Sequence, residues 1–243
     1  MPVTRAKPEN LEKPRRFWKE AVAGPREDGG FPVLLDGRAA KTPGGAKLLL
    51  PTEGLARLVA AEWAAQGERL EIATMPATRL AFTALERVPA AREAVAEEVA
   101  RYAGSDLLCY FAEGPEALVE RQEAGWGPLL DWAGGELDLR FERATGIVHR
   151  EQPSETGERV KALALGLDDF GLAGLASATA LFGSAVLGLA LQRGRLDGGA
   201  AFALSRLDEA FQEEQWGIDA EAAERAAAMR AEARMLERWF AAL

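Results

Sequence analysis

The sequence predicts an α+β protein, with a small N-terminal strand–helix domain at residues 1–75 and a larger helical bundle at residues 76–243. Two observations support this prediction. Short apolar runs separated by glycine, proline and aspartate are concentrated before Met75, whereas apolar residues spaced three and four apart dominate after it. The change of period near Met75-Pro76 marks the expected domain boundary.

The N-terminal part contains several short strand-like segments. Residues 16–22 and 31–35 are expected to pair across a turn, and the dipeptide Asp36-Gly37 is a strong signal for a second turn. Residues 47–50 and 70–72 are predicted to form further strands. Between them, Thr52 is suited to cap a helix whose inner face carries Leu55, Leu58, Val59 and Trp63. Trp63 is therefore expected in the core.

Helical spacing continues after residue 76, interrupted by proline and glycine. Pro89 suits the first turn of a helix, and Pro115 opens another that we expect to break at residues 125–128, Gly-Trp-Gly-Pro. Alternation at residues 137–142 predicts a short extended piece. Three further helices are predicted after Pro153: one over residues 170–192, one with Phe202, Leu207 and Phe211 on its inner face, and one capped by Asp219.

Composition excludes several classes of protein. The chain has 243 residues, of which 48% are hydrophobic and 28% charged, which is enough to bury a core. Its formal net charge of −9 argues against nucleic-acid binding, because neutralising phosphates requires a basic surface. The single cysteine, Cys109, excludes an internal disulfide, and its apolar neighbours indicate an inert buried thiol.

Neither a targeting segment nor a membrane span is expected. Residues 1–20 lack an apolar core, and Glu9 and Glu12 argue against an intact mitochondrial presequence. A cytoplasmic bacterial protein or a processed mature form is therefore the simpler interpretation. Residues 170–192 carry no charge and are long enough to span a bilayer, but many glycine, serine and threonine residues dilute their hydrophobicity. We expect a central helix enclosed by others, without stable membrane insertion.

The sequence lacks the combinations of residues that form the common catalytic sites. One histidine, His149, and one cysteine cannot form the common zinc sites, and the paired glycines at positions 29 and 44 do not lead into a phosphate-binding helix. We therefore predict no catalytic residue, no metal and no cofactor. With 38 acidic residues, however, an acid–base hydrolase that uses paired carboxylates stays open as the alternative function.

Acidic and aromatic residues gather near the C-terminal end of the chain. The acidic residues are Asp208, Glu209, Glu213 and Glu214, followed by Trp216. Glu209 and Glu213 form an i, i+4 like-charge pair, which destabilises an exposed helix by about 0.2–0.5 kcal/mol. This region is either a solvated face or an acidic patch that recognises a basic partner. Near the N-terminus, Phe17 and Trp18 cannot both face one side of a strand, and we include Trp18 among the partner contacts.

Five stretches together resemble the mitochondrial and bacterial family of F-type ATP synthase assembly chaperones that are specific for the alpha subunit. They cover nearly the whole chain in order: RFWKE from Arg16, GGFPVLLDGRAAKTP from Gly29, AEWAAQGERLEIATMPATRLAFTALERV from Ala61, SDLLCYFAEGPEALVERQEAGWGPLLDW from Ser105 and LDEAFQEEQWGIDAEAAERAAAMR from Leu207.

This resemblance implies an N-terminal β-rich domain and a C-terminal orthogonal α-helical bundle, with neither catalysis nor a bound cofactor. It also implies that the chain binds free alpha subunit and shields its apolar interface until the beta subunit replaces it. Residues Asp208 to Glu214 become the expected partner-contact region. The expected form is a cytoplasmic bacterial monomer, with eukaryotic relatives in the mitochondrial matrix.

Overall fold

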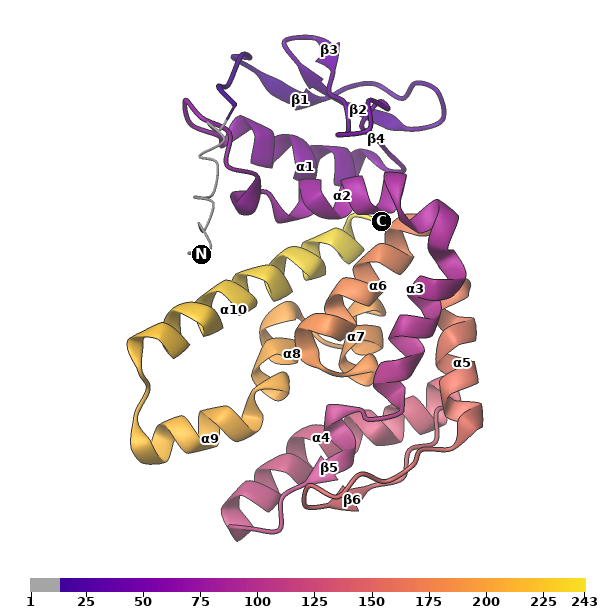
Figure 1. The fold of residues 1–243 in the computed structure, drawn as a ribbon, viewed down its shortest axis with the longest axis vertical. Coiled ribbons are helices and arrows are strands. Elements are labelled where there is room, and N and C mark those ends of the chain that lie inside the picture. Colours follow the sequence, from indigo (N-terminus) through magenta and orange to yellow (C-terminus); the bar gives the residue numbers. More distant parts are fainter. Residues whose placement is uncertain (1–13) are drawn as a thin grey trace, which may run out of the picture.

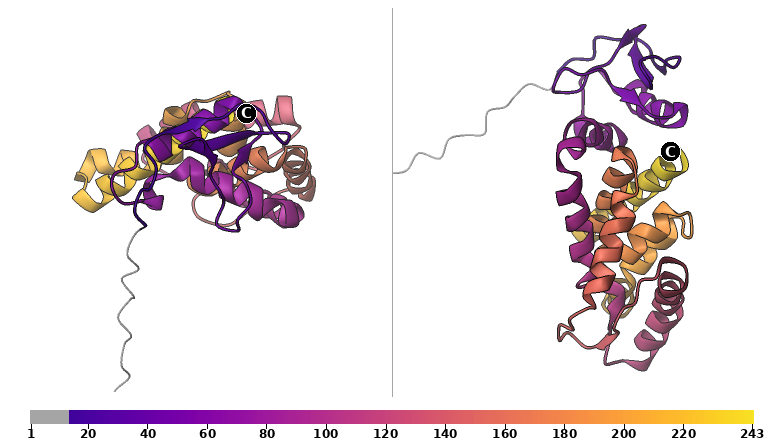
Figure 2. Two further views of the ribbon diagram at one scale, coloured as in Figure 1. Left: turned by 90° about the horizontal axis from the view of Figure 1, so that it is seen from above. Right: turned by 90° about the vertical axis from the view of Figure 1, so that its right-hand side faces the viewer.

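A small sheet lies at one end of the molecule and a stack of helices forms the rest (Figure 1). The computed structural model describes residues 14–243. Helices α1 (Glu53–Ala64) and α2 (Pro76–Glu86) lie between the sheet and the remaining helices, and the right-hand view of Figure 2 shows the same order of layers. The predicted α+β class is confirmed, and the buried residues of both parts form one hydrophobic core.

The sheet is built around one central strand. Strand β2 (Phe31–Leu35) pairs antiparallel with β1 (Ala21–Ala23), β3 (Arg38–Ala39) and β4 (Leu49–Leu50). Asp36 and Gly37 have φ values of 47° and 77°, so this turn takes the two left-handed residues that suit a tight hairpin. The first predicted strand begins only at Ala21, and residues 72–74 form a 3₁₀ helix in place of the last one.

The helical part uses most of the remaining chain. Its elements are the 3₁₀ turns η1 (Ile72–Thr74) and η2 (Leu107–Cys109), the parallel pair of strands β5 (Tyr110–Phe111) and β6 (Ala144–Thr145), and the helices α3 (Val88–Ala103), α4 (Glu116–Leu137), α5 (Ser154–Leu165), α6 (Asp169–Phe182), α7 (Ala185–Gln192), α8 (Gly198–Ser205), α9 (Leu207–Trp216) and α10 (Ala220–Ala241).

Helix α1 follows its sequence signals closely. The Thr52 Oγ1 atom accepts a hydrogen bond from the Leu55 backbone N–H at 3.1 Å, as an N-cap residue should. Leu55, Val59 and Trp63 are buried on the face that the helical spacing predicted. The core position of Trp63 is therefore confirmed.

The prediction of a break in α4 at residues 125–128 is wrong. The helix runs through this segment with Pro128 inside it, because buried Trp126, Leu129 and Trp132 continue one apolar face across the prolyl residue. The Trp126 indole N–H also donates to the Leu204 carbonyl at 3.0 Å. Gly125 lets this neighbour approach, since a Cβ atom there would lie 2.8 Å from the Leu204 side chain.

The uncharged segment 170–192 is two helices rather than the single one predicted. Gly183 takes a left-handed conformation with φ of 65°, and Ser184 Oγ then caps α7 by accepting from the Leu187 backbone N–H at 3.0 Å. Both helices are largely buried by their neighbours. Within residues 14–243, every helix is too short or too polar to cross a bilayer.

A buried carboxylate holds the start of α7. Asp106 is fully buried, and its Oδ1 atom accepts from Ser184 Oγ at 2.6 Å and from the Leu108 backbone N–H at 3.1 Å. Its Oδ2 atom accepts from the Val186 backbone N–H at 3.1 Å. Burial outweighs these hydrogen bonds and raises the pKa of Asp106 to about 6.

This raised pKa predicts a pH dependence of stability. Between its unfolded pKa of 3.8 and its folded pKa of about 6, Asp106 binds a proton in the native state only. Native stability from this group therefore falls as pH rises through that window, by up to about 3 kcal/mol. Urea unfolding at several pH values should show this loss relative to Asp106→Asn, and parallel curves for the two proteins would contradict it.

Close helix packing gives a second prediction. A Cβ atom on Gly198 would collide with the backbone of Ala233 in α10, whereas one on the adjacent Gly199 would meet only the Asp197 side chain, at 3.2 Å. We expect Gly198→Ala to lower the free energy of unfolding by about 2 kcal/mol through overpacking. The matched Gly199→Ala variant should stay within about 0.5 kcal/mol of the parent. Equal effects in urea titrations would refute this account of the α8–α10 contact.

Candidate partner-binding surface

Helices α9 and α10 form an arm at one side of the molecule and diverge from a shared turn (Figure 1). Gly217 makes this turn with a φ of 84°, a conformation that favours glycine. Asp219 then caps α10, its carboxylate accepting from the backbone N–H groups of Glu221 and Ala222 at 2.9 and 3.3 Å. The predicted cap at Asp219 is confirmed.

The four acidic residues of α9 do not form one patch. Asp208 lies against α4, where its Oδ1 atom accepts from the Gln122 side-chain amide at 2.7 Å. Gln122 is fully buried, and its side-chain Oε1 atom accepts from the Ala112 backbone N–H at 2.8 Å. Asp208 thus satisfies a buried amide, which is a structural role.

Glu214 also faces α4, through Arg121. The two side chains form an ion pair at 2.8 Å, and this contact lowers the pKa of Glu214 and raises that of Arg121. The Arg121 guanidinium also lies 5.1 Å from the centre of the Phe211 ring. Because both charged groups are about half exposed, the pair orients α9 more than it stabilises the fold.

Glu209 and Glu213 occupy the other side of α9. Glu213 is partly buried and pairs with Arg206 at 2.9 Å, which reduces the repulsion expected from the i, i+4 spacing. Glu209 is exposed, and no cation within the described part of the chain pairs with it. Of the acidic residues predicted to contact a partner, Glu209 is therefore the most available.

The tip of the arm exposes large apolar side chains. Trp216 is 80% exposed, and Ile218 in the turn is 52% exposed. By helical spacing, Trp216 lies on the same side of α9 as Glu209 and Glu213. We call Glu209, Glu213 and Trp216 the α9 face. It combines charge with exposed aromatic surface, which is typical of protein-binding sites.

Trp18 is not available to a partner, so its prediction as a contact residue is corrected. It is only 4% exposed, because its ring packs on Trp63 with 5.1 Å between ring centres. Its indole N–H donates to the Trp63 carbonyl at 3.3 Å. The neighbouring Phe17 points outward and is 81% exposed, as expected when adjacent residues of an extended chain face opposite sides.

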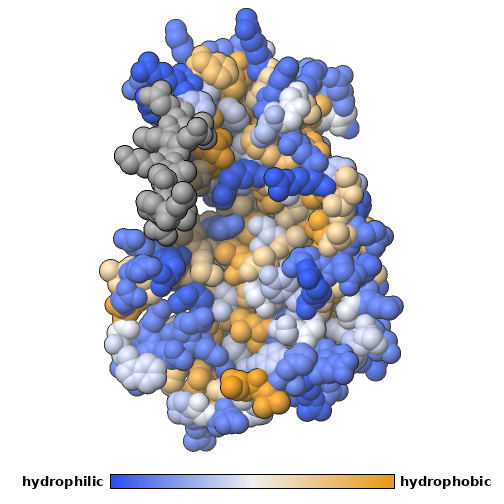
Figure 3. Space-filling model, viewed as in Figure 1, coloured by the Kyte–Doolittle hydropathy of each residue, from blue (hydrophilic) through white to orange (hydrophobic). Residues whose placement is uncertain are grey.

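A groove of about 520 Å³ lies between α9, α10 and the end of α8. Its lining mixes small apolar residues with cations. The lining residues are Phe202, Ala203, Arg206, Ala210, Glu213, Ile218, Ala223, Ala226, Ala227, Arg230, Ala231 and Arg234. We call this hollow the α9–α10 groove. In the space-filling view, hydrophilic side chains interrupt the apolar surface over this arm (Figure 3).

Sequence reasoning missed this groove. It treated the α10 segment only as the last helix of the bundle, although Arg230 and Arg234 stand four residues apart among alanines. That spacing places both cations on one helix face. The missing information was that α10 projects beyond its neighbours, which depends on tertiary packing.

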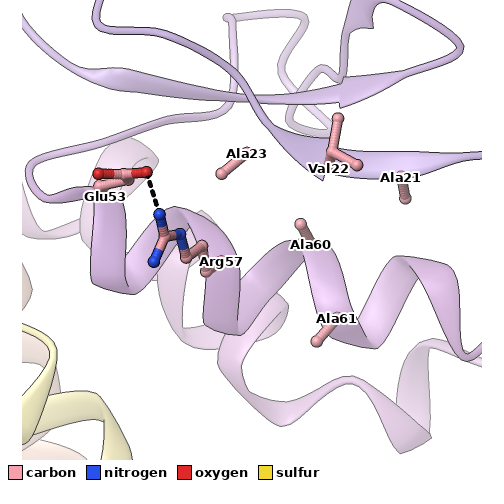
Figure 4. Close-up of a pocket in the computed structure, with 7 residues that line it drawn as sticks. All are labelled: Ala21, Val22, Ala23, Glu53, Arg57, Ala60 and Ala61. Atoms are coloured by element: carbon pink, nitrogen blue, oxygen red, sulfur yellow. Dashed lines mark hydrogen bonds and ion pairs between the residues drawn. The ribbon is translucent and has the colours of Figure 1, made fainter.

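A second hollow, of about 410 Å³, lies between β1 and α1 (Figure 4). It is lined mostly by small side chains, including Ala21, Ala23 and Ala60. Its one carboxylate, Glu53, is paired with Arg57. This hollow offers no pair of acids for the alternative hydrolase chemistry.

The other groups considered for chemistry lie apart from both hollows. His149 is exposed and its Nδ1 atom lies 3.0 Å from the Tyr110 hydroxyl. Cys109 is buried, as predicted, and burial raises the pKa of its thiol, which disfavours the reactive thiolate. Among residues 14–243, no three histidine, cysteine or acidic side chains are placed to hold a metal ion.

A further apolar patch follows β6. Ile147 and Val148 are 99% and 76% exposed in the loop beside Tyr110 and His149. Hydrophobic residues are visible on the surface over the β5–β6 end in Figure 3. The patch is separate from the α9–α10 groove, because none of its residues lines that groove.

Comparison with known proteins gives one consistent family. Residues 15–134 match the family model described as ATP12 chaperone protein. The crystal structure of Atp12 from Paracoccus denitrificans is 44% identical and covers 93% of this chain and 97% of that chain, with a TM-score of 0.86; a structure of a mutant of that protein matches equally well. The mitochondrial protein atp12 of Schizosaccharomyces pombe is 26% identical over 219 residues, covering 84% of this chain and 74% of the relative.

The fold and the family model define the class of protein as a chaperone. The chain belongs to the ATP12 chaperone family, which acts in ATP synthase assembly.

The two adjacent acids at the start of α9 should behave differently when truncated. Asp208→Ala leaves the buried Gln122 amide without its acceptor, so we expect it to lower the free energy of unfolding by about 1–3 kcal/mol. Glu209→Ala removes an exposed side chain and should change the free energy of unfolding by less than about 0.5 kcal/mol. Chemical denaturation of both variants checks this, and a larger loss for Glu209→Ala would reverse the assignment.

Proposed function

We propose that this protein binds the free alpha subunit of the F-type ATP synthase head and shields its apolar interface until the beta subunit replaces it. Membership of the ATP12 chaperone family supports an assembly role. The observation that favours a polypeptide partner is the exposed arm, where Trp216 and Ile218 are accessible beside Glu209, which no cation among residues 14–243 pairs with.

The chemistry of this surface suits reversible binding. A chaperone that yields its client must cover apolar surface without the affinity of a permanent interface. Exposed Trp216 supplies a large contact area at one point, while the charge of Glu209 speeds and orients the encounter with a basic surface on the client. The net charge of −9 extends this attraction over a longer range.

We propose neither a reaction nor a cofactor for this protein. For the hydrolase alternative, a carboxyl group with a raised pKa would have to reach a substrate. Asp106 has such a pKa, yet it is fully buried and its oxygens accept hydrogen bonds from η2 and α7. We further propose that the chain acts as a monomer in a bacterial cytoplasm, with its eukaryotic relatives in the mitochondrial matrix.

The direct test is binding to each purified head subunit. We expect the protein to bind isolated alpha subunit in preference to beta and to suppress aggregation of alpha without ATP, because binding alone covers the apolar surface. Light scattering and surface plasmon resonance measure the two effects. Equal affinity for alpha and beta would contradict the proposal.

Variants of the α9 face locate the contact. Glu209→Lys combined with Trp216→Ala should weaken alpha binding at least about ten-fold, equivalent to about 1.4 kcal/mol, with unchanged circular dichroism. Glu20→Lys makes the same charge change at an exposed position in the N-terminal part and serves as the matched control. Wild-type affinity in the double variant would move the contact away from α9.

A further inference from the structure

The α9–α10 groove has an apolar floor and an excess of positive charge. Phe202 closes the floor near α8 and is almost completely buried, with the Arg230 guanidinium 5.0 Å from its ring centre. Three arginines and one glutamate line the groove. This local excess of cations stands out on a chain whose net charge is −9.

Two of these cations lack an anionic partner among residues 14–243. Arg206 is engaged by Glu213 at 2.9 Å, but no carboxylate of the described chain lies within ion-pair distance of Arg230 or Arg234. Both side chains are on exposed positions of α10, four residues apart. An occupant that carries carboxylates at the same spacing would complement them.

The walls determine the conformation of the occupant. They are helices, whose backbone N–H and C=O groups are already paired within each helix and offer no edge for an extended strand. A segment buried between them must satisfy its own backbone hydrogen bonds, which a helix does. The alanines on these helices would let a third helix approach to the usual packing distance of about 8–10 Å.

We propose that the α9–α10 groove receives an amphipathic helix of the bound client, with its apolar face on Ile218 and the alanines and its carboxylates on Arg230 and Arg234. This inference rests on the proposed function, because the client is the alpha subunit. The groove would be a second contact with the client, in which cations of this chain meet acidic groups, whereas on the α9 face Glu209 would meet a basic group. Helix-in-groove binding gives the interface its register through apolar anchors spaced three and four residues apart.

Neighbouring alanines of α10 provide a matched test. Ala227 lines the groove, whereas Ala228 is exposed but does not line it. Filling the groove with Ala227→Trp should weaken binding of purified alpha subunit by about ten-fold or more, while Ala228→Trp should change it less than about two-fold. Both substitutions are on solvent-exposed positions, so circular dichroism and the melting temperature should match those of the parent.

Neutralising the cations tests the chemistry of the occupant. Arg230→Gln combined with Arg234→Gln should weaken alpha binding about ten-fold at low salt, with a smaller loss at high salt where the ion pairs are screened. The control is Arg193→Gln with Arg195→Gln, which removes the same charge from an exposed loop outside the groove. If the variant with both Arg230→Gln and Arg234→Gln keeps wild-type affinity and salt dependence, an acidic occupant of the groove is excluded.

The remaining outcomes separate this inference from the proposed function. If the Ala227→Trp variant bound alpha subunit with wild-type affinity, the α9–α10 groove would not be the client site, and the proposed chaperone function would be unaffected. Failure of the parent protein to bind alpha would overturn both. A concentration-dependent dimer in sedimentation velocity that Ala227→Trp abolishes would assign the groove to a second copy of this chain and overturn the client helix.

Discussion

The close contact between α10 and the centre of the bundle fixes where the arm and its groove lie. A Cβ atom on Gly174 of α6 would lie within 3 Å of the rings of Trp239 and Phe240, so only glycine lets these helices meet at this distance. The Trp239 indole N–H donates to the Phe170 carbonyl at 3.1 Å, and Thr52 donates to the Ala242 carbonyl. With its C-terminal half held in this way, α10 can project its N-terminal half on a rigid base.

This arrangement places negative and positive charge on the same arm, which consists of α9 and α10. Glu209 carries negative charge on α9, and Arg230 and Arg234 carry positive charge across the groove on α10. A client surface that matches both must be oriented in one way, since the reverse orientation would bring like charges together. In the proposed complex, exposed apolar residues would add affinity between these charged groups.

The sequence predicts most elements, because caps and periodicity act locally. The Asp36-Gly37 turn and the inner face of α1 follow from neighbouring residues alone, and both are as expected. Errors occur where tertiary packing overrides a local signal: buried aromatic residues carry α4 through Pro128, and Trp63 draws Trp18 into the core. The groove could not be predicted, since it exists only between helices whose relative placement local patterns do not specify.

The buried state of Cys109 has a practical consequence for following client capture. The thiol is inaccessible and its raised pKa keeps it protonated at neutral pH, so maleimide dyes should leave the folded protein unlabelled. Because the chain has no other cysteine, one introduced at an exposed position such as 212 on α9 would be the sole reactive site. If the client docks on α9 as proposed, a fluorophore attached there would report docking and release in real time without removal of the native thiol.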